Sequence, residues 1–132
     1  MNCLEILPEL TQYQFAVPNH VWEEIHRRPQ RLRLRKVFKE GWLEEAEITD
    51  LAEIETYSKY RTRFGAGESA CLALACSRGW IVASDEKAVK REVALKLGAA
   101  RMIDTKTLLQ DAVNKSILTE MKFKDLCDRF EF

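Results

Sequence analysis

The sequence predicts an α/β fold in which helices flank a parallel sheet. Between residues 64 and 105 the chain alternates between a small-residue helix, the strand Trp80–Ser84, a helix over Lys87–Leu97 and a further strand. Glu68 opens the first helix and Asp85 directly follows the first strand. Ligands and chemistry gather at the carboxyl ends of parallel strands. This stretch therefore predicts both the fold and the edge of the sheet that carries the site.

The length and composition are those of one domain over residues 1–132. The chain is long enough to bury a core. Lys+Arg and Asp+Glu both total 21, so any contact with nucleic acid must come from a local patch rather than from the overall charge. The four cysteines form no C-x-x-C pair and there are two histidines, which disfavours a zinc site. No signal peptide or membrane-length apolar run is recognisable, so a cytoplasmic protein without membrane contact is expected.

The first part of the chain supplies elements for one side of the sheet. Residues 3–10 read as the end of a helix. Tyr13–Val17 reads as a short strand because its apolar residues alternate. Asn19 is a typical N-cap for a helix over residues 20–26. Trp42–Ile48 alternates weakly and is expected at an edge of the sheet.

Capping residues mark the expected starts of the later helices. Thr49 or Asp50 is expected to cap a helix that contains Leu51, Ile54 and Tyr57. Asp104 or Thr105 is expected to cap another, and a last helix is expected to start near Thr119. No internal repeat or linker separates these elements, which agrees with a single domain.

Four acids are candidates for a shared site: Glu24, Glu68, Asp85 and Asp104. Converging carboxylates suit Mg²⁺ or Mn²⁺, which prefer oxygen ligands. A simpler reading stays open for each acid. Glu24 can be a solvated glutamate at the border of a buried face. Glu68 can be an acid favoured by the helix dipole, and Asp85 can be a helix cap.

A basic segment covers residues 27–36. Its charged residues are Arg27, Arg28, Arg31, Arg33, Arg35 and Lys36. Arginine binds phosphate with a planar fork, so the segment is a candidate nucleic-acid contact. The alternative is a solvated helix face, neutralised by the acids at positions 44–55. Other chemistries lack a motif: the chain has no Walker A, G-x-G-x-x-G or G-x-S-x-G sequence.

Three stretches together resemble the PIN-domain family of nucleases. Val17–Ile25 resembles that family's strand, proline and helix with an inward glutamate. Gly67–Ala75 is similar to the small-residue helix that opens with Gly-Glu in a bacterial and archaeal subgroup. Ile81–Ala88 resembles the strand that ends in the family's late catalytic aspartate. The resemblance covers roughly residues 3–118. It is supported by three separate motifs that occur in the order typical of the family, since each motif alone is weak.

The resemblance implies a three-layer α/β/α fold and a metal-dependent ribonuclease. By that resemblance, Glu24, Glu68 and Asp85 hold Mg²⁺ or Mn²⁺ as catalytic residues, with Asp104 as an additional ligand. The substrate would be RNA, cut by metal-activated water. Family members are often homodimers, and toxin members of toxin–antitoxin pairs are silenced by an antitoxin protein.

The chain departs from the family pattern at its start. The family opens with a central strand that ends in a metal-binding aspartate, and residues 3–10 already resemble the helix after it. We therefore expect this N-terminal central strand to be missing and the acidic site to be incomplete. Direct pairing of the flanking strands, the carboxyl-terminal tail or a neighbouring subunit would then close the sheet. Two alternatives to an active enzyme follow: a catalytically incompetent PIN-fold module that binds nucleic acid or protein, and an unrelated doubly wound domain.

Overall fold

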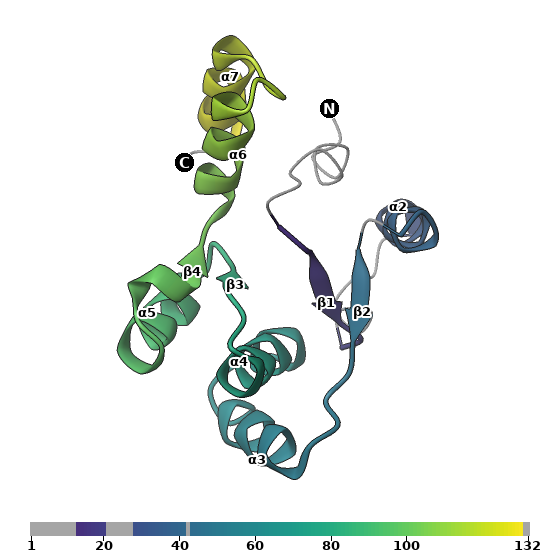
Figure 1. Cartoon of the computed structure of the whole chain (residues 1–132), viewed down its shortest axis with the longest axis vertical. Coiled ribbons are helices and arrows are strands. Elements are labelled where there is room, and N and C mark those ends of the chain that lie inside the picture. The colour runs from purple at the N-terminus through teal and green to yellow at the C-terminus, as the bar shows by residue number, and fades with distance from the viewer. Residues whose placement is uncertain (1–12, 21–27, 42, 131–132) are drawn as a thin grey trace.

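The computed structural model describes residues 13–20, 28–41 and 43–130, and Figure 1 labels their elements. In chain order these are β1 (Ala16–Pro18), α2 (Arg28–Lys39), β2 (Glu44–Ala46), α3 (Leu51–Tyr60), α4 (Ala66–Arg78), β3 (Val82–Ala83), α5 (Lys87–Lys96), a 3-10 turn (Ala99–Arg101), β4 (Met102–Ile103), α6 (Thr105–Asn114) and α7 (Glu120–Phe130). The predicted helices at residues 3–10 and 20–26 lie outside the described residues, apart from His20. The other predicted helices and strands are present, and the strands are shorter than predicted.

The strands form two parallel pairs. β1 pairs with β2 in the register Ala16 to Glu44, and β3 pairs with β4 in the register Val82 to Met102. Among the described residues, no strand ladder joins one pair to the other. Direct pairing of the flanking strands β1 and β3, one of the three ways considered for closing the sheet, is therefore wrong for this part of the chain.

Helix α4 contacts both strand pairs and so connects them. It packs against β1, β3, α3 and α5, and its residues Ala70 and Leu72–Ala75 are buried. Short side chains allow this close approach of several elements to one helix. The helix ends where predicted: Gly79 takes the left-handed conformation at φ 72° and its N–H donates to the Ala75 carbonyl.

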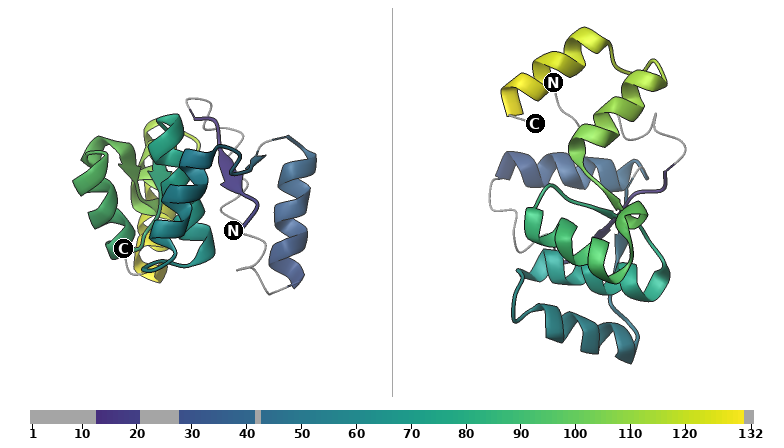
Figure 2. Two further views of the ribbon diagram at one scale, coloured as in Figure 1. Left: turned by 90° about the horizontal axis from the view of Figure 1, so that it is seen from below. Right: turned by 90° about the vertical axis from the view of Figure 1, so that its left-hand side faces the viewer.

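Helices cover the strands on both sides, as expected for a three-layer α/β/α fold. Figure 2 shows α2 on one flank and α5 on the opposite flank, with the strands between them. One buried cluster joins the α3–α4 and α5 regions through Tyr60, Leu72 and Val93. Within the described part, no helix combines the length and the apolar character needed to cross a bilayer.

The carboxyl-terminal helices have a core of their own. Leu109 of α6 and Leu126 of α7 belong to a second buried cluster, on which Tyr13 and Phe15 pack. The Tyr13 hydroxyl also donates to Asp111 Oδ2 at 2.6 Å. The segment before β1 is thus anchored to α6, almost a hundred residues away in the sequence.

One acid of the 44–55 run is part of the core. Glu53 is 1% exposed and accepts hydrogen bonds from Arg78 Nε at 2.9 Å and from the Thr49 N–H at 3.1 Å. The Arg78 guanidinium is the main cause that lowers the pKa of Glu53 to about 2. Neutralisation of the basic segment by this acid is therefore wrong, because Glu53 is committed to the α3–α4 hairpin.

Candidate acidic site and nucleic-acid interface

Asp85 and Asp104 lie at the carboxyl ends of the paired strands β3 and β4. Asp104 directly follows β4, and Asp85 comes two residues after β3. Thr105, the first residue of α6, connects them. Its N–H donates to Asp85 Oδ1 at 2.9 Å and its hydroxyl donates to Asp85 Oδ2 at 2.6 Å. The parallel pairing thus brings these two candidate acids to one edge of the β3–β4 pair.

Asp104 is the N-cap of α6. Its Oδ1 accepts from the Thr107 N–H at 2.8 Å and from the Thr107 hydroxyl at 2.7 Å. Its Oδ2 accepts from Lys90 Nζ at 3.1 Å. The hydrogen bonds from Thr107, followed by the Lys90 ammonium, lower the pKa of Asp104 to about 2. Asp104 is therefore ionised throughout the physiological range.

The two carboxylates share one property: each of their four oxygens accepts a hydrogen bond from the protein. A carboxylate offers about four lone-pair positions. Room for a further ligand is therefore left on both acids, but their present orientation is fixed by α5 and α6.

In the described part of the chain, Glu68 does not form a three-acid group with this pair. Glu68 lies half-buried in the first turn of α4, as predicted. Glu24 lies outside the described residues. Among the residues with a described placement, no group of three or more His, Cys, Asp or Glu side chains could hold a metal ion. Glu68, Asp85 and Asp104 alone therefore do not form a three-acid centre.

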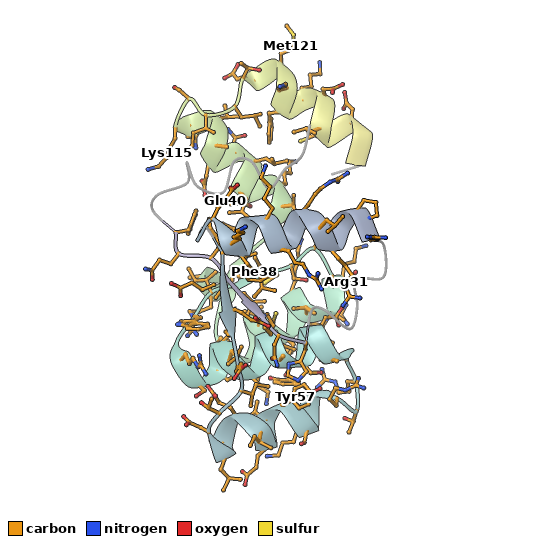
Figure 3. The ribbon with its side chains drawn as sticks, turned by 90° about the vertical axis from the view of Figure 1, so that its right-hand side faces the viewer. Arg31, Phe38, Glu40, Tyr57, Lys115 and Met121 are labelled. Carbon is orange, nitrogen blue, oxygen red and sulfur yellow. The ribbon has the colours of Figure 1, made fainter. Side chains whose placement is uncertain are left out.

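The predicted basic segment forms most of α2. Arg28, Arg33, Arg35 and Lys36 are exposed, and Arg27 lies outside the described residues. Figure 3 shows Arg31 and Phe38 on the side of α2 that faces the rest of the molecule, and both are half-buried. Lys36 lies 3.9 Å from Glu40 with 75% of its side chain exposed, and such a contact holds a charge only weakly. The outer face of α2 therefore presents cations to the solvent.

A hollow of about 480 Å³ lies elsewhere, at the β1–β2 pair. Of the candidate site acids, Glu68, Asp85 and Asp104 do not line it. Its lining residues are Ala16, Glu44, Glu45, Ala46, Glu47, Thr49, Arg78 and Trp80.

Comparison with protein families decides the kind of domain. A family model described as a PIN domain matches residues 1–130. The chain belongs to the PIN-domain family. This confirms the family resemblance and the fold class read from the sequence. No curated protein and no solved structure matches the chain at a significant level.

PIN domains generally use divalent metals, and the described acids of this PIN domain fit such an ion in kind. Asp85 and Asp104 follow two paired strands and offer carboxylate oxygens, the ligands that Mg²⁺ and Mn²⁺ prefer. Two carboxylates are fewer ligands than such an ion needs, so the remaining oxygen ligands have to come from water or from residues other than the described acids. The present hydrogen bonds of Asp85 and Asp104 show what an entering ion would compete with.

Sequence reasoning missed three residues around the acids of this PIN domain. Thr105 holds Asp85 and Thr107 holds Asp104. The Asp-Thr-Lys-Thr sequence is a signal for the local contact of Asp104 with Thr107, whereas Thr105 meets Asp85 across 20 residues of the chain. Lys90 had no comparable signal. It reaches Asp104 because α5 packs against β4, a contact that depends on the tertiary fold.

Proposed function

We propose that this chain is a PIN-type, metal-dependent ribonuclease whose site is built on Asp85 and Asp104. The observation that carries the proposal is their position: both acids lie at the carboxyl ends of the paired strands β3 and β4, linked through Thr105. The family resemblance gives Glu68 and Glu24 as further acids of the proposed site. A divalent cation held there would supply activated water and would stabilise the charge on the leaving oxygen.

The chain's own residues have separate tasks in this proposal. Thr105 fixes the orientation of Asp85 through its N–H and its hydroxyl. Thr107 fixes Asp104 in the same way. The exposed guanidinium groups of α2 bind RNA phosphates, because the neutral net charge leaves attraction to a local patch.

A second candidate is a PIN-fold module that binds RNA without cleaving it. The specific observation in its favour is that all four oxygens of Asp85 and Asp104 are already hydrogen-bonded within the protein. In this case the two acids act as anchors for α6. The α2 face would then carry the function alone.

Cleavage of a labelled single-stranded RNA in Mn²⁺ separates the two candidates. If the chain is a ribonuclease, it should cleave the RNA, EDTA should stop the cleavage, and Asp85→Asn should lower its rate at least tenfold. Asp128→Asn, a change of an exposed acid on α7, is the matched control and should leave cleavage unchanged. RNA binding without cleavage in every divalent metal tried would support the binding module and contradict the ribonuclease.

Two partners come from the family resemblance alone. We propose a homodimer and, by analogy with toxin members of the family, an inhibitory antitoxin protein. Light scattering on the purified chain tests the first. A measured mass near the 15.3 kDa of one chain would contradict the homodimer.

A further inference from the structure

Lys90 places a positive charge beside the acid pair. It lies in α5, the helix that begins two residues after Asp85, and its Nζ is 3.1 Å from Asp104 Oδ2. The Lys90 side chain is 37% exposed and that of Asp104 is 31% exposed. Both partners of this ion pair are therefore in contact with the solvent.

The contact has a consequence for metal binding. An opposite charge within hydrogen-bond distance favours the ionised form of a carboxylate. Lys90 supplies this charge to Asp104. A divalent ion at Asp104 Oδ2 would meet the like charge of Lys90, and the ion pair would have to open. The flexible stem of lysine and its partial exposure make this opening inexpensive.

We propose that Lys90 is a built-in competitor of the divalent cation, occupying Asp104 in the metal-free protein and leaving it when the ion binds. This inference rests on the metal site of the proposed function. It adds that the affinity of this site for a cation is set by a residue outside the acid set. Lys90 thus regulates occupancy of the site and is not itself a ligand.

Titration with Mn²⁺, followed by the loss of free Mn²⁺ signal in electron paramagnetic resonance, tests the proposal without any activity assay. Lys90→Gln should bind Mn²⁺ about two- to fivefold more tightly than the unchanged chain, the range given by an exposed ion pair. Lys90→Arg keeps the charge and should bind like the unchanged chain. Lys87→Gln removes an exposed charge from the same helix and should also change little.

Adding Asp104→Asn to Lys90→Gln should remove the gain, because the freed carboxylate is then absent. The proposal is overturned if Lys90→Gln binds no more tightly than the unchanged chain, if Lys87→Gln gains equally, or if neither the unchanged chain nor Lys90→Gln binds Mn²⁺.

RNA cleavage, measured on the same samples, separates this inference from the proposed function. A gain in Mn²⁺ affinity without cleavage by any variant would leave the competition standing and would remove the ribonuclease. Cleavage by the unchanged chain, with no gain in Mn²⁺ affinity for Lys90→Gln, would support the ribonuclease and contradict the competition by Lys90.

Discussion

Thr105 holds Asp85 with both of its donors: its N–H reaches Oδ1 at 2.9 Å and its hydroxyl reaches Oδ2 at 2.6 Å. The contact joins the end of β3 to the start of α6. Thr105→Val removes the hydroxyl bond and should lower the free energy of unfolding by about 1 kcal/mol, since a charged acceptor loses one donor. Urea unfolding measures the change.

Two controls accompany this prediction. Thr105→Ser keeps the hydroxyl and should retain most of the stability. Thr49→Val changes an exposed threonine and should have little effect. A loss for Thr105→Ser with none for Thr105→Val would show that the methyl group, not the hydrogen bond, carries the contribution.

The Glu53–Arg78 pair gives the prediction with the largest expected effect on stability. Glu53 is 1% exposed and Arg78 donates to both of its oxygens, at 2.9 and 3.2 Å. Arg78→Met leaves a buried carboxylate without its cation and should cost about 3 kcal/mol. Arg91→Met, which changes an exposed arginine on α5, is the control. A loss below about 1 kcal/mol in urea unfolding would contradict a buried, paired Glu53.

The same pair predicts how stability depends on pH. The pKa of Glu53 is about 2 in the folded protein and 4.5 without the fold. A lowered folded pKa favours the folded state above the unfolded pKa, and this contribution is lost as the pH falls from about 4.5 towards 2. Glu53→Gln should therefore show a shallower loss of stability in that window. If the free energy of unfolding fell equally in the two proteins between pH 7 and pH 2.5, the lowered pKa of Glu53 would be contradicted.

The exposed face of α2 predicts salt-dependent RNA binding. Changing Arg28, Arg33 and Lys36 together to glutamine should weaken binding to single-stranded RNA and lower the slope of log K against log salt by about two. Lys122→Gln with Lys124→Gln removes exposed charge from α7 and serves as the control. Fluorescence anisotropy at several salt concentrations measures both. Equal losses for the two sets would show that general charge, not α2, binds the RNA.

The sequence predicted the parts of this fold that depend on local signals. Asp50 and Asp104 cap α3 and α6, and Gly79 ends α4 in the left-handed conformation. These features follow from the backbone chemistry of single residues. Asp85 likewise follows a strand, as expected, because the apolar residues before it form β3.

The parts that sequence reasoning missed depend on distant residues. Glu53 is buried because Arg78 reaches it from 25 residues away, and Glu92 is buried because Arg63 reaches it from 29 residues away. A charged residue in a polar run carries no local mark of such a partner. The lengths of the strands were likewise overestimated, because pairing partners and not alternation alone determine where a ladder ends.

We propose that Asp85 and Asp104 together form the metal-binding edge of this PIN domain. Paramagnetic broadening by substoichiometric Mn²⁺ in a ¹H–¹⁵N spectrum tests it most directly, because Mn²⁺ removes the signals of amides near the bound ion. We expect the amide signals of Asp85, Asp104 and Thr105 to disappear first, and the double substitution Asp85→Asn with Asp104→Asn to prevent their loss. Broadening that spares these amides, or that survives both substitutions, would contradict it.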